Sequence, residues 1–321
     1  MKIATNMFMS PENTGPGSFA RRLASELTAR GFVFLPEDAI PKADLYYCSA
    51  FFSNAPLNAC KHRLTPAVLR VDGLGAAQDF DRVRNSYKAA DVVIFQSEYS
   101  SKLFKSTHQF EPVHSFVIHN GVEIKPYERL YNRYANEFVS ICNTWNKHRY
   151  QNFLDVIYKN LPAIKRAIPN FCWTIVGKYQ EFKDVMIDVD NMPIKFIQFR
   201  PDINYLRQIA KGCIHIVPTD SCPNSVIESL EQGVPCIVWH DSGGPELIGK
   251  GGIVLNSDDP YEVIDAIRQI SSKHEEYSLA ARQQAETCLD IKLVANKYEE
   301  VFKNARTPQG ASWNKLLQRS E

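Results

Sequence analysis

The segment from Ile214 to Ile248 constrains the fold of this chain more than any other. It begins with a β-branched run that ends in a proline, which is typical of a buried parallel strand before a loop. Turn residues follow at 220–224, and apolar residues then recur at helical spacing until Gly233 ends the helix. A second strand comes almost at once, at Pro235–Trp239. The order strand, loop, helix, strand predicts an α/β chain with parallel sheets.

Both loops of this segment open on the same edge of the predicted sheet. In an open parallel sheet, ligands lie beyond the carboxyl ends of the strands, where helix N-termini offer N–H groups and a partial positive charge to an anion. The first helix would offer its first residues, Asn224, Ser225 and Val226, and the second loop includes Glu246. We therefore expect a phosphate site at this edge.

Two acidic side chains, Asp220 and Glu228, bracket the first loop, with seven residues between them. Glu228 would lie near the start of the helix, where a carboxylate can accept hydrogen bonds from neutral hydroxyls such as those of a ribose. The spacing alone is equally compatible with a second interpretation, in which Glu228 complements the helix dipole and Asp220 caps a turn.

The frame D-SCPNSVI-E that these two residues enclose, and the SLEQGVPCIVWHDSGGPELI that follows Glu228, resemble the signature of the retaining glycosyltransferases of family 4. That signature is an acidic residue, seven intervening residues and a glutamate, then a small-residue helix, a G-x-P strand and a Gly-Gly-x-x-Glu loop. The family usually has glutamate at the first acidic position, and Asp220 is one methylene shorter. The resemblance implies that Glu228 holds the ribose of a nucleotide, while Asp220, as a catalytic residue, and Glu246 orient the donor sugar and the cleft.

The resemblance extends from about Gly15 to Val301 and is strongest over Ala90–Val122 and Ile214–Ile248. It implies the GT-B fold, in which two Rossmann-like parallel-sheet domains face a cleft and a C-terminal helix crosses back to the first domain. A chain of 321 residues with 44% hydrophobic content can fill two such cores. We expect an N-terminal acceptor domain, a nucleotide-sugar-binding domain and a C-terminal tail, at residues 1–125, 126–300 and 301–321.

In the first half, the pattern predicts strands at Lys2–Phe8 and Phe116–Val122. Gly17 lies in a glycine turn that leads into an amphipathic helix, and glycine lets backbone approach a substrate closely. The turn resembles the family's loop near the donor phosphates. Asp72 follows the predicted strand Pro66–Val71, so we expect it as a catalytic residue of the cleft, where many family members have a histidine; the alternative is that it caps the next turn.

In the second half, the loop 143–150 follows the strand Glu137–Cys142 and is rich in cations. In the family, Arg or Lys in the matching loop stabilises the departing diphosphate, and Arg149 lies nearest the family's lysine, with Lys147 as second choice. The loop lacks the family's Gly-Arg pair, and a solvated basic turn is the alternative. Arg200 lies in the loop that corresponds to the family's seat for the base.

The resemblance implies no resident metal or other cofactor, because the nucleotide diphosphate sugar is a substrate and GT-B enzymes generally need no bound divalent metal. Asp188 and Asp190 resemble the metal-binding D-x-D of a different glycosyltransferase fold, but they lie in a polar stretch without a strand before it. We interpret this motif as fortuitous.

Composition excludes several classes of protein. The net charge of +1 gives no broad electrostatic case for nucleic acid as a partner. The eight cysteines include no CxxC pair, which favours buried thiols in a reducing compartment. The sequence shows no signal peptide and no apolar run of the roughly 18 to 20 residues that a membrane span needs. We expect a cytoplasmic protein whose tail, with Trp313, Leu316 and Leu317 at helical spacing, docks on a domain, is disordered or touches a membrane surface.

The sequence thus predicts a retaining glycosyltransferase, of the hexosyltransferase class, that moves a sugar from a nucleotide diphosphate sugar to a hydroxyl-bearing acceptor. The acceptor, whether a glycan, a lipid-linked molecule or a small molecule, is open, as are the base, the sugar, the linkage and the oligomeric state. Two alternatives remain. One is a nucleotide-sugar epimerase of the same fold, and the other is a non-catalytic homologue that binds the nucleotide sugar.

Overall fold

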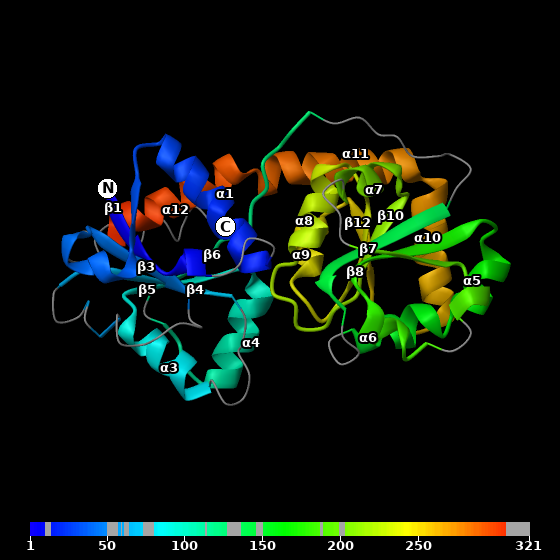
Figure 1. The fold of residues 1–321 in the computed structure, drawn as a ribbon, viewed down its shortest axis with the longest axis horizontal. Helices are drawn as coiled ribbons and strands as arrows, with labels where there is room; N and C mark the ends of the chain where they lie inside the picture. The colour runs from blue at the N-terminus through cyan, green and yellow to red at the C-terminus, as the bar shows by residue number, and fades with distance from the viewer. Residues whose placement is uncertain are drawn as a thin grey trace. The chain divides into compact units, whose positions relative to one another are not determined.

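The structure is a computed structural model of the chain. It describes residues 1–9, 14–49, 57–58, 60, 64–72, 80–112, 114–126, 136–145, 150–186, 189–198 and 203–305. These residues form two compact units (Figure 1). Unit 1 consists of Met1–Glu123 together with residues 290–305, and unit 2 consists of Ile124–Leu289. Residues 290–300, which the sequence analysis assigned to the second domain, therefore lie in unit 1.

Unit 1 is built on a parallel sheet that has six strands among the described residues, in the order β2-β1-β3-β4-β5-β6. The strands are β1 Lys2–Thr5, β2 Val33–Pro36, β3 Leu45–Ser49, β4 Ala67–Val71, β5 Val92–Phe95 and β6 Ser115–Val117. The helices are α1 Gly15–Ala29, α3 Phe80–Ala89, α4 Glu98–His108 and α12 Ile291–Ala305, with 3₁₀ turns at Met7–Met9 and Glu37–Lys42.

The two faces of this sheet are covered by different helices (Figure 1). Successive side chains of a strand point to opposite faces. Along β3, Leu45 and Tyr47 pack in a core with α1 and α12, whereas Tyr46 and Cys48 pack in a core with α3 and α4. Unit 1 is therefore a doubly wound α/β layer structure.

Two predicted strands of unit 1 are shorter than the sequence suggested. The first ends at Thr5, because the Thr5 hydroxyl accepts a hydrogen bond from the Met7 N–H at 3.1 Å and turns the chain into a 3₁₀ turn. The last ends at Val117, and the polar residue Asn120 beyond it joins a buried network described below. An apolar run alone did not show where sheet pairing stops.

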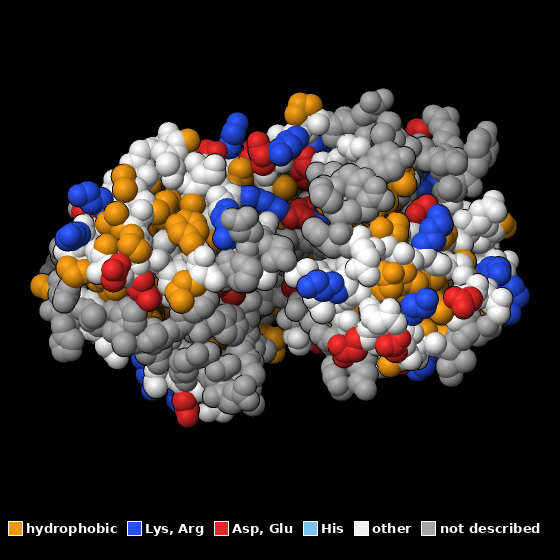
Figure 2. All heavy atoms as spheres, viewed as in Figure 1, with side chains coloured by type: hydrophobic (Ala, Val, Ile, Leu, Met, Phe, Trp, Pro, Cys, Tyr) orange, Lys and Arg blue, Asp and Glu red, His pale blue; other side chains and the backbone are white. Residues whose placement is uncertain are grey.

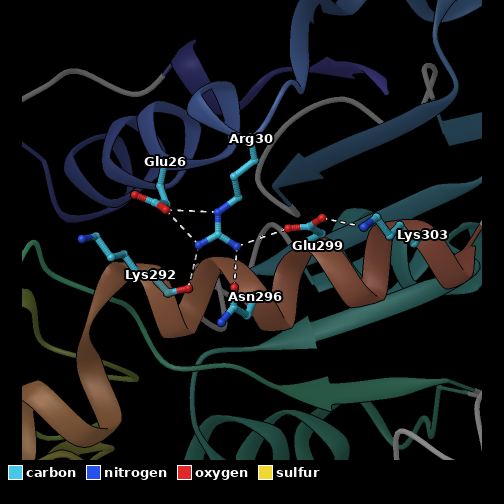
Figure 3. A network of polar contacts seen from close by, with 6 residues as sticks. All are labelled: Glu26, Arg30, Lys292, Asn296, Glu299 and Lys303. Atoms are coloured by element: carbon cyan, nitrogen blue, oxygen red, sulfur yellow. Dashed lines mark hydrogen bonds and ion pairs between the residues drawn. The ribbon is translucent and has the colours of Figure 1, made fainter.

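Helix α12 packs against α1 and the sheet by apolar and by charged contacts. In the core, Tyr298 and Phe302 contact the rings of Phe19 and Tyr47. At the surface, Arg30 at the end of α1 reaches α12 (Figure 3).

The Arg30 guanidinium bridges groups of both helices. It donates to Glu26 at 2.8 Å and to Glu299 at 3.2 Å, and also to the Lys292 carbonyl and the Asn296 side chain (Figure 3). A hydrogen bond from Lys303 lowers the pKa of Glu299, and Arg30 acts in the same direction against the effect of burial. Arg30 and Glu299 are each 21% exposed, so their ion pair adds little to the free energy of unfolding. The main effect of the network is to orient α1 and α12 relative to each other.

Unit 2 repeats the architecture, with a parallel sheet of six strands among its described residues in the order β12-β11-β10-β7-β8-β9. The strands are β7 Asn136–Thr144, β8 Phe171–Lys178, β9 Ile194–Ile197, β10 Gly212–His215, β11 Cys236–Trp239 and β12 Gly252–Leu255. The α-helices are α5 Leu161–Ala167, α6 Gln180–Lys183, α7 Ile203–Ile209, α8 Asn224–Glu231, α9 Gly244–Ile248, α10 Pro260–Ser272 and α11 His274–Gln284. A 3₁₀ turn lies at Val189–Asn191, and π-helical turns lie at Phe153–Tyr158 and Ala285–Leu289.

Helices cover both faces of this sheet as well (Figure 1). Ile214 and Ile237 lie in one core with α5 and α10. On the opposite face, Cys236 contacts the Val226 carbonyl of α8, and α11 packs on α8. The segment around β10, α8 and β11 is thus buried from both sides, as its continuous apolar runs predicted.

Gly177 permits β7 and β8 to stay paired across an irregularity. The register shifts between Ile141 and Thr144 of β7, so that two residues of β7 oppose Gly177 of β8. Gly177 has φ +135°, and a Cβ there would lie 1.8 Å from the Cys142 carbonyl oxygen. Only glycine fits this position without moving a strand.

We therefore expect Gly177→Ala to lower the free energy of unfolding of unit 2 by about 2–4 kcal/mol, as the sum of backbone strain and overpacking. Gly31→Ala is the matched control, because Gly31 has φ +84° but nothing lies within 4 Å of its Cβ position. Gly31→Ala tests the cost of the backbone conformation alone, and its free energy of unfolding should fall by about 1 kcal/mol. Denaturant unfolding of both variants measures the difference, and equal losses would contradict the steric argument.

The surface charges and the cysteines of the structure agree with what the composition suggested. Figure 2 shows Lys and Arg side chains interspersed with Asp and Glu over the described residues of this face. All eight cysteines have free thiols, and five of them are buried. Within the described ranges, no helix has both the length and the hydropathy needed to cross a membrane.

Candidate functional site

The loop between β10 and α8 is held in a strained conformation by the loop after β11. Thr219 has φ +59°, which is rare for a β-branched residue. Its N–H donates to the Asp241 carbonyl at 2.8 Å, and the Gly243 N–H donates to the Asp220 carbonyl at 2.8 Å. Strain of this kind persists only where surrounding contacts determine the conformation, and it concentrates at functional sites.

Helix α8 begins at the carboxyl edge of the sheet, as the sequence predicted. Pro223 occupies the N-cap position, and its side chain has no oxygen with which to cap the helix. The Val226 and Ile227 amides donate back to the Pro223 carbonyl at 3.1 and 3.2 Å. The amides of Asn224 and Ser225, which precede them, are first-turn donors directed out of the helix, so this end of α8 attracts an anion.

His215, the last residue of β10, connects two predicted site residues. Its Nε2 lies 3.2 Å from Asp220 Oδ2, and its Nδ1 lies 3.1 Å from Ser225 Oγ. The side chains of His215 and Asp220 are 11% and 16% exposed. The structure thus brings Asp220 and Ser225 together on the imidazole ring of His215. The sequence pattern indicated His215 only as part of a strand.

Glu228 forms an ion pair that the sequence did not reveal. Arg207 Nη2 in α7 donates to Glu228 Oε2 at 2.5 Å. The Arg207 side chain is 4% exposed, whereas Glu228 is 22% exposed and can still reach a ligand. Arg207 therefore fixes the carboxylate from within the protein.

Two buried thiols near the site have shifted pKa values. A hydrogen bond with Cys236 lowers the pKa of the Cys213 thiol below its usual range, while burial opposes this effect and the nearby Arg207 guanidinium adds to it. Burial raises the pKa of Cys236.

Glu246 lies in the first turn of α9, the short helix that follows the second of the two connected loops, and is partly exposed. The Ser242 hydroxyl donates to the Trp239 carbonyl at 2.7 Å and accepts from the Gly244 N–H at 3.0 Å, which shapes this loop. A Cβ on Gly244 would lie 2.9 Å from Val238 Cβ, so the loop follows β11 closely.

Two predicted site residues lie in unit 1. Gly17 is in the first turn of α1, where its N–H donates to the Thr14 hydroxyl at 3.3 Å and its carbonyl accepts from Arg21 at 3.0 Å. Its amide thus takes part in the helix cap, and a contact with the donor stays a prediction.

Asp72, the second of them, follows β4 and belongs to a buried polar network. Arg70 Nε donates to Asp72 Oδ1 at 2.6 Å, and Gln96 Nε2 donates to the same oxygen at 3.0 Å. Arg70 also donates to Asn120 Oδ1 at 2.7 Å and to the Tyr298 hydroxyl at 3.0 Å. Because the Asp72 side chain is 1% exposed, it supports the ends of the strands, and its role as a catalytic residue stays a prediction.

Four other residues singled out in the sequence, Lys147, Arg149, Arg200 and Asp188, lie outside the described residues, as does the tail with Trp313. Among the residues that are described, no group of three or more His, Cys, Asp or Glu side chains could hold a metal ion.

One family model matches the part of the chain that contains the candidate site. Residues 137–273 match the family model described as glycosyl transferases group 1, which covers most of unit 2 and both loops. No curated protein sequence matches the chain.

Several solved structures resemble the whole chain. HepE of Anabaena, in complex with UDP-glucose, has a TM-score of 0.70 at 15% identity and covers 94% of this chain and 99% of its own. Sucrose-phosphate synthase from Thermosynechococcus elongatus has a TM-score of 0.72 at 13% identity, with 95% and 98% covered. A glycosyltransferase from Rickettsia africae has a TM-score of 0.70 at 12% identity, with 96% and 99% covered. With the two sheets of six strands each among the described residues, these matches confirm the predicted GT-B fold, and the family model confirms the predicted resemblance over residues 137–273.

Proposed function

We propose that this chain is a retaining glycosyltransferase of the hexosyltransferase class, which moves a sugar from a nucleoside diphosphate sugar to a hydroxyl-bearing acceptor. The observation that supports it best is the grouping of the α8 N-terminus, Asp220 and Glu228 within the segment that matches the group 1 glycosyl transferases. An anion site next to two carboxylates suits a molecule that joins a diphosphate to two hydroxyl-rich groups.

Each group of the donor has a partner in this proposal. The diphosphate binds at the amides of Asn224 and Ser225, where the dipole of α8 favours negative charge. Val226, the third residue expected to bind the diphosphate, donates its amide to the Pro223 carbonyl and lies beside this contact. The ribose hydroxyls donate to Glu228, whose carboxylate Arg207 holds in place. Asp220 and Glu246, on the two connected loops, take the hydroxyls of the sugar.

The leaving group needs positive charge as it departs. Lys147 and Arg149 are the proposed cations, with Arg200 near the base and Gly17 near the diphosphate. Retention follows from the family resemblance: the acceptor attacks on the face that the diphosphate leaves, and a diphosphate oxygen takes the acceptor proton. The acceptor belongs in this proposal to unit 1, and the reaction takes place in the cytoplasm, at the membrane surface if the acceptor is linked to a lipid.

The donor and the reaction are tested together by incubating the purified full chain with UDP-, GDP- and ADP-glucose. UDP-glucose comes first, because HepE, which shares the fold, was crystallised with it. Thermal shift measures binding, while chromatography of the nucleotide and NMR of the sugar measure turnover. We expect one nucleotide to raise the melting temperature and its sugar to be released slowly or transferred, with free nucleoside diphosphate as coproduct.

The same experiment separates the alternatives. Conversion of the sugar to an epimer, with the nucleotide still attached, would replace the proposal by an epimerase. Binding without any turnover, even when glycan and lipid-linked acceptors are supplied, would favour a non-catalytic nucleotide-sugar-binding protein. Absence of binding by all three nucleotide sugars would overturn the site assignment.

A further inference from the structure

His215 has a hydrogen-bond partner at each ring nitrogen, and both partners belong to the proposed donor site. Nε2 lies 3.2 Å from the Asp220 carboxylate and Nδ1 lies 3.1 Å from the Ser225 hydroxyl. His215 ends the buried strand β10, and the main-chain bonds of Thr219 and Gly243 hold the loop that contains Asp220. The ring therefore joins the sheet to both sides of the loop.

The chemistry of the Asp220 carboxylate fixes the direction of one of these hydrogen bonds. A carboxylate only accepts hydrogen bonds, so Nε2 of His215 carries a proton. When this is the only ring proton, Nδ1 is an acceptor and the Ser225 hydroxyl donates to it. The proton of the Ser225 hydroxyl is thereby directed at the ring and not at a ligand of the helix.

We propose that His215 is a positioning residue of the donor site, which orients Asp220 toward the sugar through Nε2–H and engages the Ser225 hydroxyl through Nδ1. This inference rests on the proposed function. It assigns different tasks to the two nitrogens. The bond to Asp220 serves the sugar, whereas the bond to Ser225 leaves the backbone amide of that residue as its contact with the diphosphate.

The two tasks can be separated by amide side chains of different length. Glutamine places its amide near the position of Nε2, so His215→Gln can still donate to Asp220. Asparagine places its amide near the position of Nδ1, so His215→Asn can contact Ser225 but not Asp220. His215→Phe keeps a ring of similar size and removes both hydrogen bonds.

We expect His215→Phe and His215→Asn to lower kcat for the donor sugar by about tenfold to a hundredfold, the effect of one hydrogen bond to a charged group. His215→Gln should stay within about threefold of the natural protein, and all three variants should bind the nucleoside diphosphate alone within about threefold. Isothermal titration with UDP gives the affinities, and steady-state kinetics with UDP-glucose give kcat. If the experiment above identifies another donor, that donor and its nucleoside diphosphate are used instead.

A purely structural role for the ring predicts another pattern, in which stability, binding and kcat of the Gln and Asn variants fall together. That pattern would overturn the inference, as would a loss of kcat in His215→Gln equal to that in His215→Asn. The comparison of His215→Gln with His215→Asn remains informative if His215→Phe fails to fold.

The ring proton itself can be observed without any substrate. Two-dimensional ¹H–¹⁵N NMR of the imidazole side chains, with His215→Gln to assign the signal, distinguishes the two tautomers of the natural protein. The Nε2–H tautomer is expected, and the Nδ1–H tautomer would overturn the inference. A protein with the expected tautomer but no binding or turnover of any nucleotide sugar would instead refute the proposed function.

Discussion

Replacement of Arg70 by alanine is expected to lower the free energy of unfolding of unit 1 by about 3–5 kcal/mol, because it leaves a buried carboxylate without its cation. The Arg70 side chain is fully buried and Asp72 is 1% exposed, so water cannot replace the lost ion pair. The substitution also removes the hydrogen bonds to Asn120 and Tyr298 and the contact of the guanidinium with the Phe19 ring, 4.0 Å from its centroid.

Denaturant unfolding, followed by circular dichroism, measures this loss. Lys102→Ala is the matched control, because Lys102 is an exposed cation of the same unit and its removal should change stability by less than about 0.5 kcal/mol. The double variant Arg70→Met/Asp72→Leu should be more stable than Arg70→Ala, since both charges are gone and the volume is filled. A loss below about 1 kcal/mol in Arg70→Ala would show that the ion pair is not buried in solution.

Replacement of Glu228 by alanine is expected to have two effects at once. It removes the proposed ribose contact, which should weaken nucleoside diphosphate binding by about tenfold to a hundredfold, as for a hydrogen bond to a charged group. It also leaves the Arg207 guanidinium, 4% exposed, without its partner, which should destabilise unit 2 by about 3 kcal/mol. Loss of binding in this variant alone would therefore not establish a contact with the ligand.

Two further variants separate the effects. Glu228→Gln keeps an oxygen that can accept from Arg207, so it should lose less stability but still bind nucleotide more weakly. Arg207→Met/Glu228→Met removes both charges, so it should recover much of the stability and none of the binding. Glu286→Ala, which removes a 49% exposed carboxylate from another ion pair of unit 2, is the control. Full nucleotide affinity in the double variant, measured by calorimetry, would refute the ribose contact.

The sequence predicted the sheet around the candidate site because burial on both faces leaves an unmistakable pattern. The run at 235–239 is apolar throughout, the run at 214–217 is apolar apart from His215, and Gly233 ends the helix between them with φ +62°. Local chemistry sufficed for these elements.

The site's supporting contacts could not be predicted in the same way, because they join residues whose positions only the fold relates. Arg207 and Glu228 are 21 residues apart, and Arg70 and Tyr298 are 228 apart. His215 did leave a signal, as a polar residue in the middle of an apolar run directly before the site. A polar side chain buried at the end of a parallel strand needs a partner, and in this fold the partner lies in the loop beyond the strand.

Unit 1 is made from two separate parts of the chain, and this affects the order in which the protein is synthesised and folds. Ribosomes produce unit 2 in full before they reach α12, whose Tyr298 and Phe302 complete the core between α1 and β3. Until then, Phe19 and Tyr47 lack the helix that covers them, so a nascent chain has an exposed apolar surface on its first 123 residues. Unit 2 should therefore be the first to mature during translation, and the early part of the chain should bind chaperones until α12 emerges.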